Sequence, residues 1–107
     1  MNKEQLKGHS TMLILATLER KSLHGYALSL VLRDSMPDEF KFGMGMLYPL
    51  LHKLEKQKYI TGAWQETGNG QRRVYELTRK GEKELQAKKA DWVVFQKAIT
   101  RIIHAAV

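Results

Sequence analysis

Apolar residues with helical spacing mark the middle of the chain. Four leucines fall at i, i+3, i+4 and i+7, namely Leu47, Leu50, Leu51 and Leu54. This spacing predicts one apolar stripe along an amphipathic helix. Proline lacks a backbone N–H, so Pro49 indicates that the helix begins just before it. We therefore expect a short helix within residues 43–58.

The other side of this predicted helix is polar. It carries a hydroxyl, an imidazole and two ammonium groups, from Tyr48, His52, Lys53 and Lys56. Such a face suits the recognition helix of a winged helix-turn-helix, because a helix fits the major groove of DNA. The alternative is an ordinary core helix whose lysines are solvated. The rest of the chain favours the first interpretation.

Two further helices are predicted before it. The apolar run within residues 10–20 predicts a deeply buried helix with Ser10 or Thr11 as its N-cap. A second helix is expected over residues 25–35. It ends at Met36, because the residue before Pro37 avoids helical geometry.

After residue 58 the hydrophobic period changes to two. Alternation over residues 60–65 and 72–77 predicts two strands, and the glycine-rich stretch 67–71 predicts the turn between them. The returning strand opens with Arg72 and Arg73. A basic hairpin directly after a basic helix is typical of a DNA-binding wing, whereas a hairpin of this kind standing alone is usually a solvated turn.

A long helix is predicted over residues 79–105, with Thr78 as its N-cap. Its apolar residues follow heptad spacing, and a helix of this length, about 40 Å, is too long for the preceding residues to cover. We expect the uncovered stripe to pair with a second copy of the chain in a symmetric dimer. The dimerisation residues predicted in this way are Leu85, Trp92, Phe95, Ile99, Ile102 and Ile103.

The expected fold is mainly α with a small β-hairpin. Residues 1–78 form a winged helix-turn-helix DNA-binding domain, and residues 79–107 form a C-terminal dimerisation helix, the two making one structural unit in the dimer.

Charge is distributed unevenly. The net charge of the chain is +7, and lysine and arginine balance aspartate and glutamate within residues 1–40, so residues 41–107 carry the whole excess. Polyanions, with double-stranded DNA ahead of membranes, are the expected partners. Tyr48 and His52 are candidates for hydrogen bonds to bases or phosphates, although the Tyr48 ring could instead pack against the second helix. The predicted phosphate contacts are Lys41, Lys53, Lys56, Arg72 and Arg73.

The composition argues against several other functions. The chain has no cysteine, which excludes disulfides and favours a reducing, cytoplasmic location. Its four histidines are scattered without metal-ligand spacing, and no nucleophile–base pair stands out. We therefore expect no enzyme activity, metal or cofactor. The apolar run near the N-terminus is too short to span a membrane.

Three motifs together resemble the PadR-family transcriptional regulators. They are His24-Gly25-Tyr26, the stretch from Gly45 to Glu55, and the stretch from Gly70 to Thr78. The resemblance implies a winged helix-turn-helix repressor that dimerises through its C-terminal helix, binds a palindromic operator and is released by a small effector. Met46 departs from the family pattern, in which threonine is common at this position.

In having a single helix at its C-terminal end, the chain resembles the smaller subgroup of the PadR family. Some members of that subgroup bind drugs between paired tryptophans at the dimer interface, which implies a small aromatic effector for Trp92, with Phe95 beside it. Plain dimer packing is the other interpretation of Trp92. The alternative function is a small-molecule-binding dimer of the multidrug type, for which DNA binding is secondary.

Overall fold

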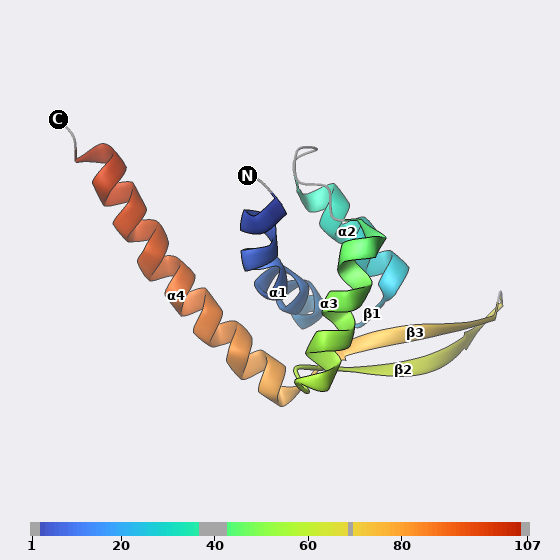
Figure 1. The fold of residues 1–107 in the computed structure, drawn as a ribbon. Helices are drawn as coiled ribbons and strands as arrows, with labels where there is room; N and C mark the ends of the chain where they lie inside the picture. The colour runs from blue at the N-terminus through green and yellow to red at the C-terminus, as the bar shows by residue number, and fades with distance from the viewer. Residues whose placement is uncertain (1–2, 37–42, 69, 106–107) are drawn as a thin grey trace.

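The computed structural model describes residues 3–36, 43–68 and 70–105. The first three of the four described helices gather into a body, a hairpin projects from it, and the last helix leaves it at an angle (Figure 1). This arrangement confirms the mainly helical fold with a small sheet. The elements in chain order are α1 (Lys3–Arg20), β1 (Leu23–His24), α2 (Gly25–Ser35), α3 (Met44–Lys56), β2 (Ile60–Thr67), β3 (Gly70–Leu77) and α4 (Arg79–His104).

The sheet has three antiparallel strands in the order β1-β3-β2. The hairpin is continuous from the pair Ile60 and Leu77 at its root to the pair Thr67 and Gly70 at its tip. Gly70 adopts a positive φ of 114°, a conformation that glycine reaches without strain. The sequence pattern missed β1, because two residues are too few to show a period, and this strand fixes β3 on its second edge.

The start predicted for the first helix is wrong. The helix α1 begins at Lys3, so Ser10 and Thr11 lie inside it rather than at its N-cap, and the Ser10 side chain is buried. Residues 3–7 are Lys-Glu-Gln-Leu-Lys, all good helix formers, and they extend the helix beyond the apolar run.

The start predicted for the leucine helix is also wrong. The helix α3 begins at Met44, which places Pro49 inside it at the sixth position. Proline cannot donate a backbone hydrogen bond to residue 45 and its ring crowds the carbonyl there. Gly45 occupies that position with open space where a Cβ would stand, and Pro49 itself is exposed.

The apolar core draws on every helix and on the sheet. The leucines of α3 face it as predicted: Leu47, Leu51 and Leu54 are buried and Leu50 is half-buried. Only one apolar side chain of α4, Leu85, is fully buried. Among the residues whose burial the structure describes, the buried apolar ones are Ile14, Leu15, Leu18, Leu28, Leu32, Leu47, Leu51, Leu54, Ile60, Tyr75 and Leu85.

A compact junction connects α3, β2 and α4. Lys58 has a positive φ of 63°, and the Tyr59 N–H donates to the Leu54 carbonyl at 3.0 Å, which closes the end of α3. Thr78 caps α4 as predicted, its Oγ1 accepting a hydrogen bond from the Gly81 N–H at 3.0 Å. Glycine is required at position 81 because a Cβ there would collide with the Tyr59 carbonyl oxygen.

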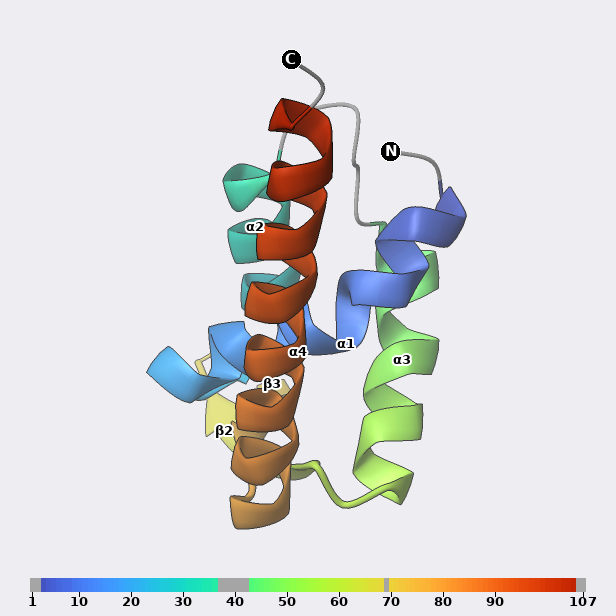
Figure 2. The same cartoon turned by 90° about the vertical axis from the view of Figure 1, so that its left-hand side faces the viewer.

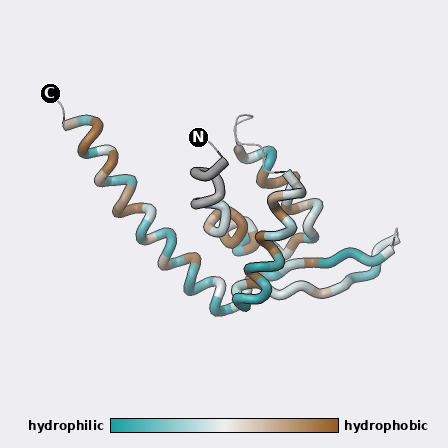
Figure 3. Tube along the Cα trace, in the orientation of Figure 1, coloured by the Kyte–Doolittle hydropathy of each residue, from teal (hydrophilic) through white to brown (hydrophobic). Residues whose placement is uncertain are grey.

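The helix α4 packs on the body from its start to about Trp92, whose ring lies edge-on to that of His9 in α1. Glu19 at the end of α1 accepts hydrogen bonds from Gln86 at 3.1 Å and from Lys89 at 2.8 Å. Farther along, α4 separates from the other helices (Figure 1), and the view at right angles shows it standing in front of α2 (Figure 2). Hydrophobic positions continue along this separated half (Figure 3). The molecule accordingly measures 60 × 30 × 20 Å.

Candidate nucleic-acid interface

An open groove of about 880 Å³ lies between α3, the start of α2 and the hairpin. We call the β2–β3 hairpin the wing. The groove is lined from α3 by Tyr48, His52 and Lys56, and from the wing by Trp64, Arg72 and Arg73. Five of the seven side chains predicted to bind DNA therefore line one groove.

The helix α3 carries three parallel rows with the spacing i, i+4 and i+7. The first row is the buried one. The second row faces the groove and consists of Tyr48, His52 and Glu55. The third row, Pro49, Lys53 and Lys56, is exposed. Lys53 thus lies on the exposed front but outside the groove lining, whereas Lys56 belongs to both.

Tyr48 both packs against the second helix and lines the groove. Its ring packs against the first residue of α2, because a Cβ on Gly25 would lie 3.1 Å from the ring Cε1 and from the hydroxyl oxygen. The side chain is nevertheless 42% exposed and lines the groove. Packing against the start of α2 therefore holds the ring in place, while part of the side chain stays open to the groove.

His24 joins the start of α2 to the wing. Its Nδ1 accepts a hydrogen bond from the Ala27 N–H at 3.1 Å and so caps α2. Its Nε2 lies 3.0 Å from Nη1 of Arg72. A neutral imidazole that accepts at Nδ1 carries its proton on Nε2, so Nε2 cannot also accept from the guanidinium. Arg72 is therefore weakly held by His24, and it remains exposed.

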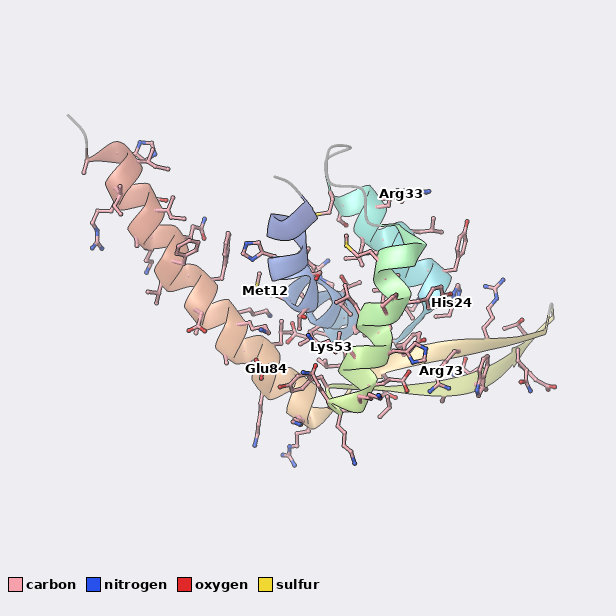
Figure 4. The ribbon with its side chains drawn as sticks, viewed as in Figure 1. Met12, His24, Arg33, Lys53, Arg73 and Glu84 are labelled. Atoms are coloured by element: carbon pink, nitrogen blue, oxygen red, sulfur yellow. The ribbon has the colours of Figure 1, made fainter. Side chains whose placement is uncertain are left out.

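Arg73 has a different environment from its neighbour. Its Nη2 and Nε donate to the two carboxylate oxygens of Glu55 at 2.7 and 3.2 Å, and its guanidinium lies 5.5 Å from the Trp64 ring centre. The hydrogen bond to Glu55 raises the pKa of the Arg73 guanidinium above its usual value. Figure 4 shows Arg73 and His24 on the side of α3 that faces the wing.

Two tyrosines near α3 have perturbed acidity. Burial, and then the charge of Glu55, raise the pKa of Tyr75 above 10.0. Tyr59 donates a hydrogen bond to Oε2 of Glu84 in α4 at 3.0 Å, and this bond raises its pKa as well. Tyr59 lies at the junction between α3 and α4, so this bond connects the two.

Several residues of the site were not identified from the sequence. Lys41 lies outside the described residues. Glu55 and Trp64 were not predicted as site residues, although the helical row of α3 and the strand alternation of the wing could have placed both at the groove. The role of Gly62 was also missed: a Cβ there would lie 2.6 Å from Nε of Arg73.

A second, smaller pocket of about 260 Å³ lies between α1 and α4. Trp92 is its main aromatic, with the His9 ring centre at 5.5 Å and the Phe95 ring centre at 6.4 Å, both in edge-on geometry. Met12, Lys88 and Asp91 complete the lining. Both residues predicted to bind an effector are thus in one pocket.

Five of the six predicted dimerisation residues are exposed in the subunit. Leu85 is the exception, since it is fully buried in the core of its own chain. The exposed members are Trp92, Phe95, Ile99, Ile102 and Ile103, with Ile102 74% exposed.

Within residues 3–36, 43–68 and 70–105, no cluster of histidine, aspartate and glutamate has an arrangement that could hold a metal ion. None of the helices described there is both long enough and apolar enough to cross a membrane.

Comparisons with known proteins agree with this geometry. Residues 14–87 match the family described as "Transcriptional regulator PadR-like family". A PadR-family transcriptional regulator from Eggerthella lenta is 30% identical with a TM-score of 0.81, covering 94% of this chain and 87% of its own. A PadR-like transcriptional regulator from Bacillus cereus is 28% identical with a TM-score of 0.85, covering 95% and 98%. A search of curated proteins gave no significant match. These neighbours confirm the winged-helix fold with a C-terminal helix.

Proposed function

The chain belongs to the PadR-like family of transcriptional regulators, and from that premise we propose that it is a dimeric repressor that binds a palindromic DNA operator and is released by a small aromatic effector. Members of this family regulate transcription and are not enzymes, as the sequence led us to expect. The proposal places the protein in the cytoplasm, with residues 1–78 binding DNA and residues 79–107 pairing the subunits.

The groove between α3 and the wing is the observation that carries the proposal. Its α3 side presents Tyr48, His52 and Lys56, and its wing side presents Arg72. A helix of this kind fits the major groove, where hydroxyl and imidazole groups reach base edges. The cations neutralise phosphates, and the release of counterions supplies much of the affinity. Lys53 adds a further charge on the exposed front of α3.

Dimerisation is supported by the apolar half of α4. Phe95 is half-exposed and Ile103 lies largely in water in the single subunit. Covering such side chains is favourable by about 1.5–3 kcal/mol each, so a second α4 packed against this face stabilises both copies. Two-fold symmetry then presents two copies of α3 to successive major grooves, about 34–36 Å apart, which is why the operator is expected to be palindromic.

Effector binding is supported by the pocket beside Trp92. It is lined by aromatic rings from two elements, and Phe95 lies at its edge while belonging to the proposed dimer face. A planar aromatic molecule stacked there would contact α1 and α4 together. The second candidate function, a small-molecule-binding dimer with secondary DNA binding, rests on this same pocket.

A titration of DNA binding tests the proposal. The probe is a labelled duplex taken from just upstream of the protein's own coding region, with and without planar aromatic compounds that quench the fluorescence of Trp92. Release of the duplex by a quenching compound supports the repressor. Quenching that leaves DNA affinity unchanged favours the second candidate, because two linked sites must influence each other reciprocally.

The Tyr48→Phe variant sharpens this test. We expect it to change sequence preference more than overall affinity, because it removes one hydroxyl and keeps the ring that packs on Gly25. Equal losses on the upstream duplex and on random DNA would remove Tyr48 from sequence recognition.

A further inference from the structure

Two adjacent arginines of the wing differ in how firmly other side chains of the protein hold them. Arg72 is exposed and lies near a histidine nitrogen that cannot accept from it while capping α2. Arg73 is partly buried and donates two hydrogen bonds to a single carboxylate, that of Glu55. Both arginines line the groove, but successive residues of a strand point to opposite sides of the sheet, so the two side chains leave β3 in different directions and meet different neighbours.

The space around Arg73 is shaped for its side chain. Trp64 stands opposite Arg73 in the register, and its ring lies on the guanidinium. Gly62, two residues earlier on β2, leaves room for the arginine, because a Cβ there would lie 2.6 Å from Nε and 2.9 Å from Cζ. The fork of the guanidinium matches the carboxylate of Glu55, a fit that the point charge of a lysine cannot reproduce.

This contact joins the wing to α3 beyond the root of the hairpin. Ile60 and Leu77 form the root, whereas Trp64 and Arg73 pair four residues farther out. Glu55 belongs to the same row of α3 as Tyr48 and His52, one turn from His52. The ion pair also neutralises a carboxylate that lines the groove and would otherwise repel phosphates.

We propose that Arg73 is a positioning residue, which holds the wing at a fixed distance and angle from α3 through Glu55, and that Arg72 is the wing arginine that meets phosphate. This inference rests on the proposed DNA binding and changes the earlier expectation that both arginines contact phosphate. Arg73 acts on DNA through the geometry of the protein and through the charge of Glu55.

Substitution of each arginine by lysine and by alanine separates the two roles. The probe is a duplex of about 30 base pairs, long enough for two half-sites, selected by the wild-type protein from a randomised pool. Its control is a scrambled duplex of the same composition. Lysine still meets a phosphate as a point charge, so Arg72→Lys keeps most of the affinity and Arg72→Ala lowers the slope of log affinity against log salt. Arg73→Lys lowers affinity for the selected duplex about tenfold, nearly as much as Arg73→Ala, and leaves the salt slope unchanged.

Glu55→Gln is expected to change DNA affinity in opposite directions, depending on whether Arg73 positions the wing or contacts phosphate. If Arg73 positions the wing, this substitution breaks the bidentate pair and lowers affinity for the selected duplex about tenfold. If Arg73 contacts phosphate directly, the same substitution frees the arginine, removes a negative charge from the groove and raises affinity. Glu76→Gln, at an exposed carboxylate on β3, is the matched control and is expected to cause no loss.

The outcomes separate this inference from the proposed function. Circular dichroism and solution mass first establish that Arg73→Lys and Glu55→Gln, the two conservative variants, keep the fold and the oligomeric state. Tighter binding by Glu55→Gln, or binding by Arg73→Lys equal to that of the wild type, overturns the positioning role while leaving DNA binding intact. A wild-type protein that selects no duplex from the pool overturns both.

Discussion

The groove beside α3 and the outer half of α4 differ in whether their side chains have partners within the subunit. In the groove, Arg73 finds its partners within the same chain, in the Glu55 carboxylate and the Trp64 ring. On outer α4, Val94 is 70% and Ile102 is 74% exposed. The Arg73 side of the groove is thus shaped within the subunit, whereas the apolar side chains of outer α4 stay exposed in it.

This difference separates two requirements of the dimeric regulator that we propose. A preshaped groove limits the entropy lost when DNA is bound, because few side chains must be ordered. An apolar face gives strong association with a partner of the same shape, and it gives no sequence recognition.

The largest effect is expected from Ile102→Asp. A carboxylate on the apolar face of α4 would be buried without a partner in the dimer, so the variant should have a solution mass near 12.4 kDa, against about twice that value for the wild type. Affinity for a two-site duplex should fall with it. Thr100→Asp adds the same charge beside Gln96, Lys97 and Arg101, and should leave the dimer intact. A dimeric Ile102→Asp variant would contradict the assigned face.

A smaller but still large effect is expected from Leu85→Ala. Leu85 is 0% exposed and connects the first half of α4 to the core, so its loss should lower the free energy of unfolding by about 2–5 kcal/mol. Urea unfolding in the Ile102→Asp background measures this without a contribution from the partner. In the same background Ile103→Ala should change stability little. Similar losses for both would show that all of α4 belongs to the body.

The sequence revealed periodic features well and long-range partners poorly. The leucine row of α3, the wing alternation and the capping of α4 by Thr78 are local patterns, and the structure contains all three. Arg73 and Glu55 are 18 residues apart on elements of different type, so no period connects them. The sequence therefore predicted a phosphate contact for Arg73, because its charge alone does not reveal that Glu55 is its partner.

The predicted starts of two helices were wrong because each was based on a single residue type, a serine cap in one case and a proline in the other. Ser10 was treated as a cap, yet good helix formers precede it and the helix starts at Lys3. Pro49 was treated as a start, yet Gly45 leaves open space in the turn before it. Leu85 fits the heptad, but its place in the subunit core depends on how α4 docks against α1. Each outcome depended on neighbours that a single-residue rule does not consider.

A moderate effect on DNA binding is expected from Lys56→Ala. Lys56 lies on the exposed front of α3 and lines the groove. If it neutralises one phosphate, the slope of log affinity against log salt should fall by about 0.9 for each subunit that loses the contact. Fluorescence anisotropy over a series of salt concentrations measures the slope. Lys97→Ala, on the polar face of α4, is the control, and an equal change in slope there would mean that overall charge, rather than the groove, guides binding.

The smallest effect is expected at the junction between the end of α3 and the start of α4, at the hydrogen bond from Tyr59 to Glu84. This bond raises the pKa of Tyr59, so the folded protein keeps the phenol proton after the unfolded chain has lost it. The contribution to stability is therefore complete below about pH 10 and declines as the pH rises through the folded pKa. Urea unfolding between about pH 8 and 11 should show a shallower alkaline decline for Tyr59→Phe than for the wild type. Glu84→Gln should also flatten the decline, because Glu84 is the main cause of the shift. An unchanged decline in both variants would mean that this bond does not link α4 to the end of α3 in solution.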